Sequence, residues 1–260
     1  MKRSLLAIAL VMACGLAQAK DRGDHKVKSC DIDSDYALST SGNAFVFTRD
    51  DAKAPKRMSL GGGKLYVDGT EASLNAADQA RVAAFEGELR QLLPEVQKVT
   101  IEAIDIAFTA LTEVARGLSS DPKASVAKLE KSHAHARREL ESRPAFVFSK
   151  EGDDALAAIV DPIVAEFVPE ITGSAVSLAM KMVFASEEKR AEMEQRLDRM
   201  GSEIDEKVNA RAEKLEPLAE AMCQRMRRMD TIDNSLEYRL PGGRPIELLN
   251  VDVKETTRAP

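Results

Sequence analysis

The feature that most constrains the fold is residues 187–229, which have the pattern of one long, highly charged helix. Pro217 lies inside this stretch, and because proline lacks an N–H and clashes with the preceding turn, we expect a kink or a break there. A helix packed in a bundle is the first interpretation, and a Met-rich groove for partners is the alternative. The apolar residues recur at steps of three or four, which places them on one helix face: Met193, Leu197, Met200, Ile204, Val208, Leu215, Leu218, Met222, Met226 and Met229.

The N-terminus has the features of an export signal. Lys2 and Arg3 precede a short apolar run, and Ala17-Gln18-Ala19 matches a cleavage site. The run is too short to span a bilayer, so we expect residues 1–19 to be a signal peptide that is removed after Ala19. The sequence before Cys14 is similar to a bacterial lipobox, and lipidation of Cys14 is the alternative. Both interpretations predict the envelope of a Gram-negative bacterium, with the periplasm as the expected compartment.

Two cysteines remain after removal of the signal peptide, Cys30 and Cys223. An even pair in an oxidising compartment favours a disulfide. Such a bond would connect the last third of the long helix to the beginning of the folded region. Two separate thiols are the alternative.

Composition limits both the core and the partners. The chain has no Trp and only 4% aromatic residues, so its core has to be built from aliphatic side chains and Met, which suits helices better than a β-sandwich. Its net charge of −6 argues against nucleic acid and against anionic membrane surfaces as partners.

Residues 30–74 have the pattern of a small antiparallel sheet, after a flexible N-terminus at 20–29. Gly42-Asn43 and Asp68-Gly69 each separate two short runs of strand-forming residues, which is the signal of a hairpin turn. The expected strands are 36–41, 44–48, 58–60, 64–67 and 70–74.

The helical region is expected over residues 75–229. Asn75 is a candidate N-cap, and Asp78 supports the first turn through the helix dipole. Pro94 interrupts the apolar pattern that follows, so a kink or a new helix is expected there. A more polar helix is predicted over 123–143, and a short extended run over 146–148.

The most apolar part of this region is residues 154–185, which Pro162, Pro169 and Gly173 punctuate. We expect kinked core helices here, and an apolar-ligand site or a membrane-facing patch is the alternative. No transmembrane segment is expected in the mature chain, because four charged residues keep each uncharged run below the roughly 20 residues that a span needs: Asp161, Glu166, Glu170 and Lys181.

The C-terminal part alternates around Pro241-Gly242-Gly243, which predicts a β-hairpin over 235–251. Residues 252–260 are expected to be a polar tail. A Cys30–Cys223 bond would bring the hairpin near the first sheet, and the two could join. Residues 30–251 are therefore expected to form a single α+β domain, mainly α, with long kinked helices packed with a small antiparallel β-sheet.

The histidines do not predict a metal site. His133 and His135 are two residues apart on a helix, so they point to different faces. Glu130 and His133 supply one E-x-x-H motif, whereas a di-iron bundle uses two such motifs.

Two further strings are similar to ligand loops only in part. Asp31, Asp33 and Asp35 lack the Gly and Glu that would complete an EF-hand calcium loop. Gly61-Gly62-Gly63-Lys64 lacks the first Gly and the final Ser/Thr of a phosphate loop. We therefore predict no catalytic residue, no metal and no cofactor.

Several strings occur in a characteristic order. Cys30 is followed by Gly63-Lys64-Leu65-Tyr66-Val67-Asp68-Gly69, Leu74-Asn75-Ala76-Ala77-Asp78-Gln79, Leu93-Pro94 and the late helical Cys223. In this order the chain resembles the YggN-like family of Gram-negative periplasmic proteins, over most of residues 30–230. The resemblance implies a periplasmic location and a structured, α-rich domain. It implies no activity and no site residues.

Together the patterns favour a non-enzymatic envelope protein that binds another protein or an unfolded client through its helices. The long charged helices, the acidic charge and the lack of a catalytic pattern support this hypothesis. A carrier that holds an apolar or lipid ligand in region 154–185 is the alternative, and a hydrolase without a local signature is the second alternative.

Overall fold

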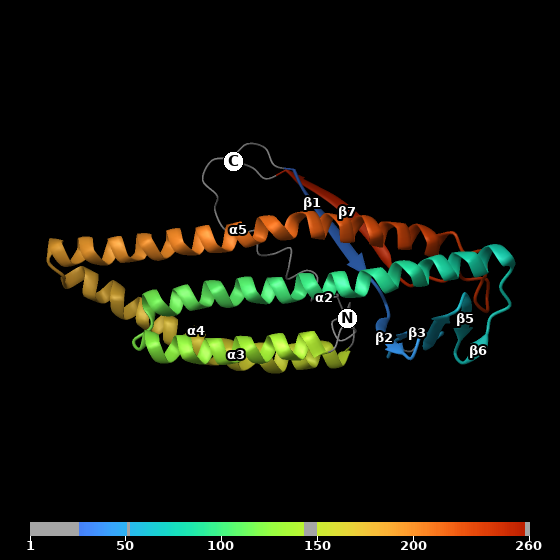
Figure 1. Cartoon of the computed structure of the whole chain (residues 1–260), viewed down its shortest axis with the longest axis horizontal. Coiled ribbons are helices and arrows are strands. Elements are labelled where there is room, and N and C mark those ends of the chain that lie inside the picture. Colours follow the sequence, from blue (N-terminus) through green and yellow to red (C-terminus); the bar gives the residue numbers. More distant parts are fainter. Residues whose placement is uncertain (1–25, 51–52, 143–149, 258–260) are drawn as a thin grey trace. The chain divides into compact units, whose positions relative to one another are not determined.

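The computed structural model describes residues 26–50, 53–142 and 150–257 (Figure 1). The expected signal peptide and the extended run at 146–148 lie outside the described residues. The described part is a mainly helical α+β fold with small antiparallel sheets, so the predicted fold class is confirmed. The elements in chain order are β1 (Lys26–Asp33), β2 (Ala37–Ser41), β3 (Ala44–Thr48), β4 (Arg57–Gly61), β5 (Lys64–Val67), β6 (Thr70–Glu71), α2 (Ala76–Leu118), α3 (Pro122–Ser142), α4 (Lys150–Phe184), α5 (Glu187–Asn234) and β7 (Asn250–Thr257).

The elements belong to two compact units, and the single domain expected over 30–251 stays a prediction. The first unit contains residues 1–98, 144–153 and 217–260, and the second contains 99–143 and 154–216. Helices α2 and α5 each contribute one part to each unit. Their apolar patterns continue through the boundaries at 98 and 216, which is why the sequence gives no sign of a division.

The first unit contains a five-stranded antiparallel sheet in the order β2-β3-β4-β5-β6. Its hairpins turn at Gly42, with φ 60°, and at Asp68-Gly69, with φ 48° and 86°. These left-handed conformations are the ones that two-residue hairpins need, so both predicted hairpins are confirmed. One face of the sheet is buried, and its Phe47 packs against Phe85 of α2 with ring centroids 6.3 Å apart.

Strands β1 and β7 form a separate two-stranded antiparallel sheet, from Lys26 opposite Thr257 to Asp33 opposite Asn250. Three expectations are corrected here. Residues 26–29 are strand rather than a flexible segment, residues 250–257 are strand rather than the end of a hairpin and a tail, and the turn around Gly243 joins no hairpin within the described residues. The two strands pair across almost the whole chain, so no local turn signal announces them.

The long helices continue through their prolines. Helices α2, α4 and α5 contain Pro94, Pro162 with Pro169, and Pro217, and none of the helices ends there. Proline removes one hydrogen bond of the helix, and at Pro94 packing on both sides offsets that loss. Leu92 and Val96, which flank Pro94, are both buried.

The second unit has its own core, to which α2, α3 and the first half of α4 contribute. The buried members of this core are Phe108, Ala115, Leu129, Ala136, Ile163 and Phe167. Beyond Phe167, the helix α4 has no buried residue among those described. Figure 1 shows this later part of α4, in gold, leading to the start of α5.

Candidate functional site: the exposed face of helix α4

Helix α4 exposes a row of large apolar side chains, which we call the α4 ridge. Their exposed fractions rise from 39% at Val160 to 83% at Phe184. Most members are four residues apart, so they follow one another along the helix surface. The ridge consists of Val160, Val164, Val168, Val176, Met180, Val183 and Phe184.

The opposite side of α4 faces the core of the second unit. Ile163 and Phe167 are buried, and Ile171 packs against the same cluster. The prediction of core helices over 154–185 therefore holds for one side of α4 only. The sequence does not reveal the exposed side, because a helix that is apolar all round carries no stripe that marks its inner face.

The polar side chains of Glu170 and Thr172, beside the ridge, form hydrogen bonds with other groups of the protein. The Glu170 carboxylate accepts hydrogen bonds from the hydroxyls of Ser119, at 2.5 Å, and Ser125, at 3.0 Å. The Thr172 hydroxyl donates to the carbonyl oxygen of Val168 in its own helix, at 2.7 Å. The charge of Glu170 is thus held at the junction of α2 and α3, away from the exposed face.

The segment Val160–Phe184 is long and apolar enough to cross a membrane, judged by length and composition alone. It is the one such helix in the described part of the chain, and 12% of its most apolar window is buried. Its low burial distinguishes α4 from an ordinary core helix of similar composition.

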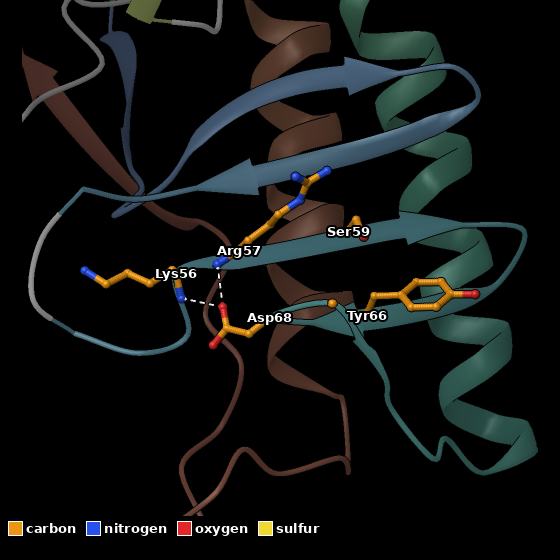
Figure 2. A pocket seen from close by; sticks show the side chains of 6 residues that line it. Lys56, Arg57, Ser59, Tyr66 and Asp68 are labelled. Atoms are coloured by element: carbon orange, nitrogen blue, oxygen red, sulfur yellow. Dashed lines mark hydrogen bonds between the residues drawn. The ribbon is translucent and has the colours of Figure 1, made fainter.

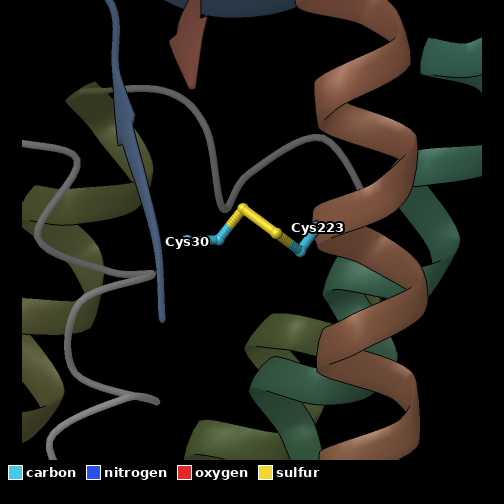
Figure 3. Close-up of a disulfide and its surroundings, with 2 residues drawn as sticks. All are labelled: Cys30 and Cys223. Atoms are coloured by element: carbon cyan, nitrogen blue, oxygen red, sulfur yellow. A yellow bond between two sulfur atoms is a disulfide. The ribbon is translucent and has the colours of Figure 1, made fainter. Parts of the chain in front are cut away.

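A disulfide connects Cys30 of β1 with Cys223 of α5, within the first unit (Figure 3). The S–S distance is 2.05 Å and the Cα atoms are 5.8 Å apart, and the sequence separation of the two cysteines is 193. The bond is compatible with export to an oxidising compartment.

An open pocket lies on the five-stranded sheet, between β4 and the β5–β6 turn (Figure 2). The Asp68 carboxylate in this pocket accepts hydrogen bonds from the backbone N–H groups of Lys56, at 2.8 Å, and Arg57, at 2.9 Å. Asp68 therefore holds the loop before β4 in place. The lining contains no nucleophile paired with a base; it consists of Lys56, Arg57, Ser59, Tyr66, Asp68 and Gly69.

The glycine-rich turn at 61–64 has an internal anion as its partner. The Glu86 carboxylate of α2 accepts hydrogen bonds from the backbone N–H groups of Gly62, at 3.0 Å, and Gly63, at 2.9 Å. Gly63 has φ 76°, and a Cβ there would come within 3.3 Å of the Gln79 carbonyl oxygen. The glycines thus allow a close approach of this turn to α2.

His133 belongs to a charged cluster in the second unit. Its Nε2 lies 2.6 Å from Asp105 Oδ1, and its ring stacks on Phe108 with centroids 4.8 Å apart. Arg137 donates to the other Asp105 oxygen, at 2.5 Å. Among the described residues no group of three or more His, Cys, Asp or Glu is arranged to hold a metal ion.

A sequence model of DUF2884, described as a protein of unknown function, matches residues 30–249. The chain belongs to the DUF2884 family. No curated protein and no solved structure matches it. The narrower YggN-like resemblance stays a prediction.

The DUF2884 chain also contains a buried acid that the sequence did not single out, Asp233 near the end of α5. Its Oδ2 accepts hydrogen bonds from the backbone N–H groups of Leu248, at 2.6 Å, and Leu249, at 3.3 Å. Its Oδ1 is buried without a hydrogen-bond partner among the described residues. Burial, with Asp230 and Glu247 nearby, raises the pKa of Asp233 to about 7, although the two backbone N–H groups act in the opposite direction.

Proposed function

We propose that this DUF2884 protein is a non-enzymatic cell-envelope protein that acts by binding, and that the α4 ridge is its binding surface. The leading partner class is an apolar segment of another polypeptide, either an envelope protein or an unfolded client. The observation that carries the proposal is the exposure of seven large apolar side chains on one helix. Contiguous apolar surface of this kind marks interaction sites in proteins.

The chemistry of the described residues is consistent with binding rather than catalysis. Two side chains with catalytic potential are engaged in structural contacts, His133 with Asp105 and Asp233 with the backbone at Leu248. The Cys30–Cys223 disulfide and the expected export signal support an envelope location.

The test is a light-scattering assay in which the purified protein delays aggregation of a reduced, unfolded test protein. Replacing Val168 and Val176 with Asp places two charges in the middle of the ridge, and we expect the delay to disappear. The matched control carries the same added charge at two exposed alanines of the second unit, Ala134→Asp with Ala191→Asp, and we expect it to retain the delay. A wild-type protein that never delays aggregation would refute a polypeptide partner.

A carrier of an apolar or lipid ligand is a second candidate, which the same ridge favours. A carrier has to enclose most of its ligand, whereas the pocket on the sheet is open to solvent. Native mass spectrometry after gentle purification tests this candidate. Bound lipid at a fixed stoichiometry would support it, and a clean mass of the unliganded chain would exclude it.

A further inference from the structure

We propose that Asp233 is a pH-sensitive clasp for the C-terminal end of the chain, which holds the segment before β7 while its carboxyl group is neutral and releases that segment when the group ionises. Residues 235–249, which connect α5 to β7, are called the strap below. All groups of the clasp lie in the first unit. The clasp does not involve the α4 ridge, so it would stand even if the proposed function failed.

The strap is anchored near each end by a buried carboxylate. Near its start, Asp78 accepts hydrogen bonds from the backbone N–H groups of Glu237 and Tyr238. At its end, Asp233 accepts hydrogen bonds from the backbone N–H groups of Leu248 and Leu249. Between and beside these anchors the strap buries four apolar side chains, Leu236, Leu240, Ile246 and Leu248.

The backbone of Leu248 is held on both of its polar groups. Its N–H donates to Asp233 Oδ2 at 2.6 Å, and its carbonyl oxygen accepts a hydrogen bond from the Ser34 hydroxyl, also at 2.6 Å. Strand β7 begins two residues later, at Asn250, which lies opposite Asp33 of β1. Among the described strands β7 is hydrogen-bonded to β1 alone. The clasp therefore fixes the point at which the C-terminal strand joins the rest of the unit.

The surroundings of Asp233 disfavour a charge on its carboxyl group. Asp233 is 2% exposed, and its Oδ1 has no hydrogen-bond partner among the described residues. It is the last residue but one of α5, where the helix dipole places partial negative charge. The charged groups that act on it are two acids, Asp230 in its own helix and Glu247 in the strap. An ionised Asp233 is stabilised by water, which it reaches only when the strap moves away.

The other anchor differs because it has a cation. Burial acts to raise the pKa of Asp78, but the backbone N–H of Glu237 and the guanidinium of Arg81, which donates at 2.7 Å, more than offset it and lower that pKa. Burial raises the pKa of Asp233 to about 7. A change of pH near neutrality therefore acts on the Asp233 end of the strap and leaves the Asp78 end closed.

The direction of the response follows from linkage. In the open state Asp233 is in water with its ordinary pKa of 3.8, whereas in the closed state its pKa is about 7. The closed state binds the proton more tightly, so opening becomes more favourable as the pH rises through this range and levels off above it. Between about pH 5 and about pH 8 we expect the equilibrium constant for opening to rise at least about tenfold.

The test is amide hydrogen exchange of the purified protein, followed residue by residue by NMR at about pH 5 and about pH 8. Protection factors are corrected for the pH dependence of intrinsic exchange. We expect protection of the Leu248 and Leu249 amides to fall at least about tenfold at the higher pH. The Glu237 and Tyr238 amides, which Asp78 binds in the same strap, serve as the internal control and should keep their protection.

A pair of variants tests whether Asp233 itself causes the response. Asp233→Asn keeps a carbonyl oxygen that can accept both N–H bonds but cannot ionise, so protection at Leu248 should no longer depend on pH. Asp205→Asn, at an exposed acid of the same helix, is the matched control and should respond as the wild-type protein does. Circular dichroism verifies that each variant is folded, and the comparison of amides within the wild-type protein requires no substitution.

Three outcomes would overturn the clasp. Constant protection at Leu248 and Leu249 across the two pH values would show that ionisation of Asp233 does not open the strap. An equal fall at Glu237 and Tyr238 would show that the whole unit opens rather than its C-terminal end. A pH response that persists in Asp233→Asn would assign the titration to another group.

Discussion

Two buried aspartates of the first unit, Asp78 and Asp233, have pKa values that are shifted in opposite directions by their surroundings. Asp78 of α2 accepts hydrogen bonds from the backbone N–H groups of Glu237, at 3.0 Å, and Tyr238, at 2.8 Å, and from Arg81 at 2.7 Å. Burial acts to raise the pKa of Asp78, but these donors more than offset it, so its pKa is lowered. Asp233 lacks a cationic partner among the described contacts, and its pKa is raised to about 7.

Asp233 should make the protein less stable as the pH rises towards neutrality. The native state binds the Asp233 proton more tightly than the unfolded chain does, because the pKa of Asp233 is about 7 in the folded protein and 3.8 in the unfolded chain. The free energy of unfolding therefore falls as the pH rises from 3.8 to about 7. Melting temperatures at about pH 5 and about pH 8 measure the effect. We expect Asp233→Asn to reduce the difference between them, and an unchanged difference would contradict the assignment.

Replacement of Asp78 with Ala should cost about 2–3 kcal/mol of unfolding free energy, because two backbone N–H groups and Arg81 lose their acceptor in a buried site. Urea unfolding at neutral pH measures the loss. Glu71→Ala is a control, since the Glu71 side chain is half exposed and its partner Lys64 is exposed as well, and we expect a change below about 1 kcal/mol. Equal effects of the two substitutions would argue against a special role for Asp78.

At the level of the elements, structure that is set by neighbouring residues could be predicted from the sequence. The turns at Gly42-Asn43 and Asp68-Gly69 formed as expected, and Asn75 caps α2 through a 2.8 Å hydrogen bond from the Asp78 N–H. The pairing of β1 with β7 could not be predicted, because it depends on residues from opposite ends of the chain. The uninterrupted course of α5 through Pro217 depends likewise on tertiary packing that no local rule contains.

The candidate site could be predicted only in part, because its composition is local but its exposure depends on tertiary packing. The apolar composition of 154–185 was evident, and a membrane-facing patch was one interpretation of it. Which side of α4 stays exposed depends on where Ile163 and Phe167 find their core, and this is a property of α2 and α3 together with α4.

In the first unit, α2 and α5 are joined by Arg225. Its guanidinium contacts Glu88 at 2.6 Å and Glu95 at 3.1 Å, and its side chain is 14% exposed. Arg225→Lys keeps the charge but loses the planar two-sided contact, so we expect a loss of about 1–2 kcal/mol in urea unfolding. Arg227→Lys, on the exposed side of α5, should cost less than about 0.5 kcal/mol. Equal losses would show that the paired geometry of Arg225 contributes nothing.

For the whole molecule, the Cys30–Cys223 bond closes a loop of nearly the entire folded chain. Replacing both cysteines with Ser should lower stability by up to about 5 kcal/mol in the chain-entropy account, measured by urea unfolding without reductant. Addition of reductant should bring the wild-type protein to the same midpoint as the variant. Free thiols at both Cys30 and Cys223 in unreduced protein, found by thiol titration, would contradict the bond itself.

The central claim is that the exposed side of α4 is where the protein meets its partner. The most direct measurement is site-specific photo-cross-linking in growing cells, with the photoreactive residue at position 176 in the ridge or, in a matched protein, at position 135 on α3. We predict that position 176 forms cross-links to lipid or to another polypeptide and that position 135 does not. Equal cross-linking at the two positions, or cross-links from position 176 only to the protein's own chain, would contradict the claim.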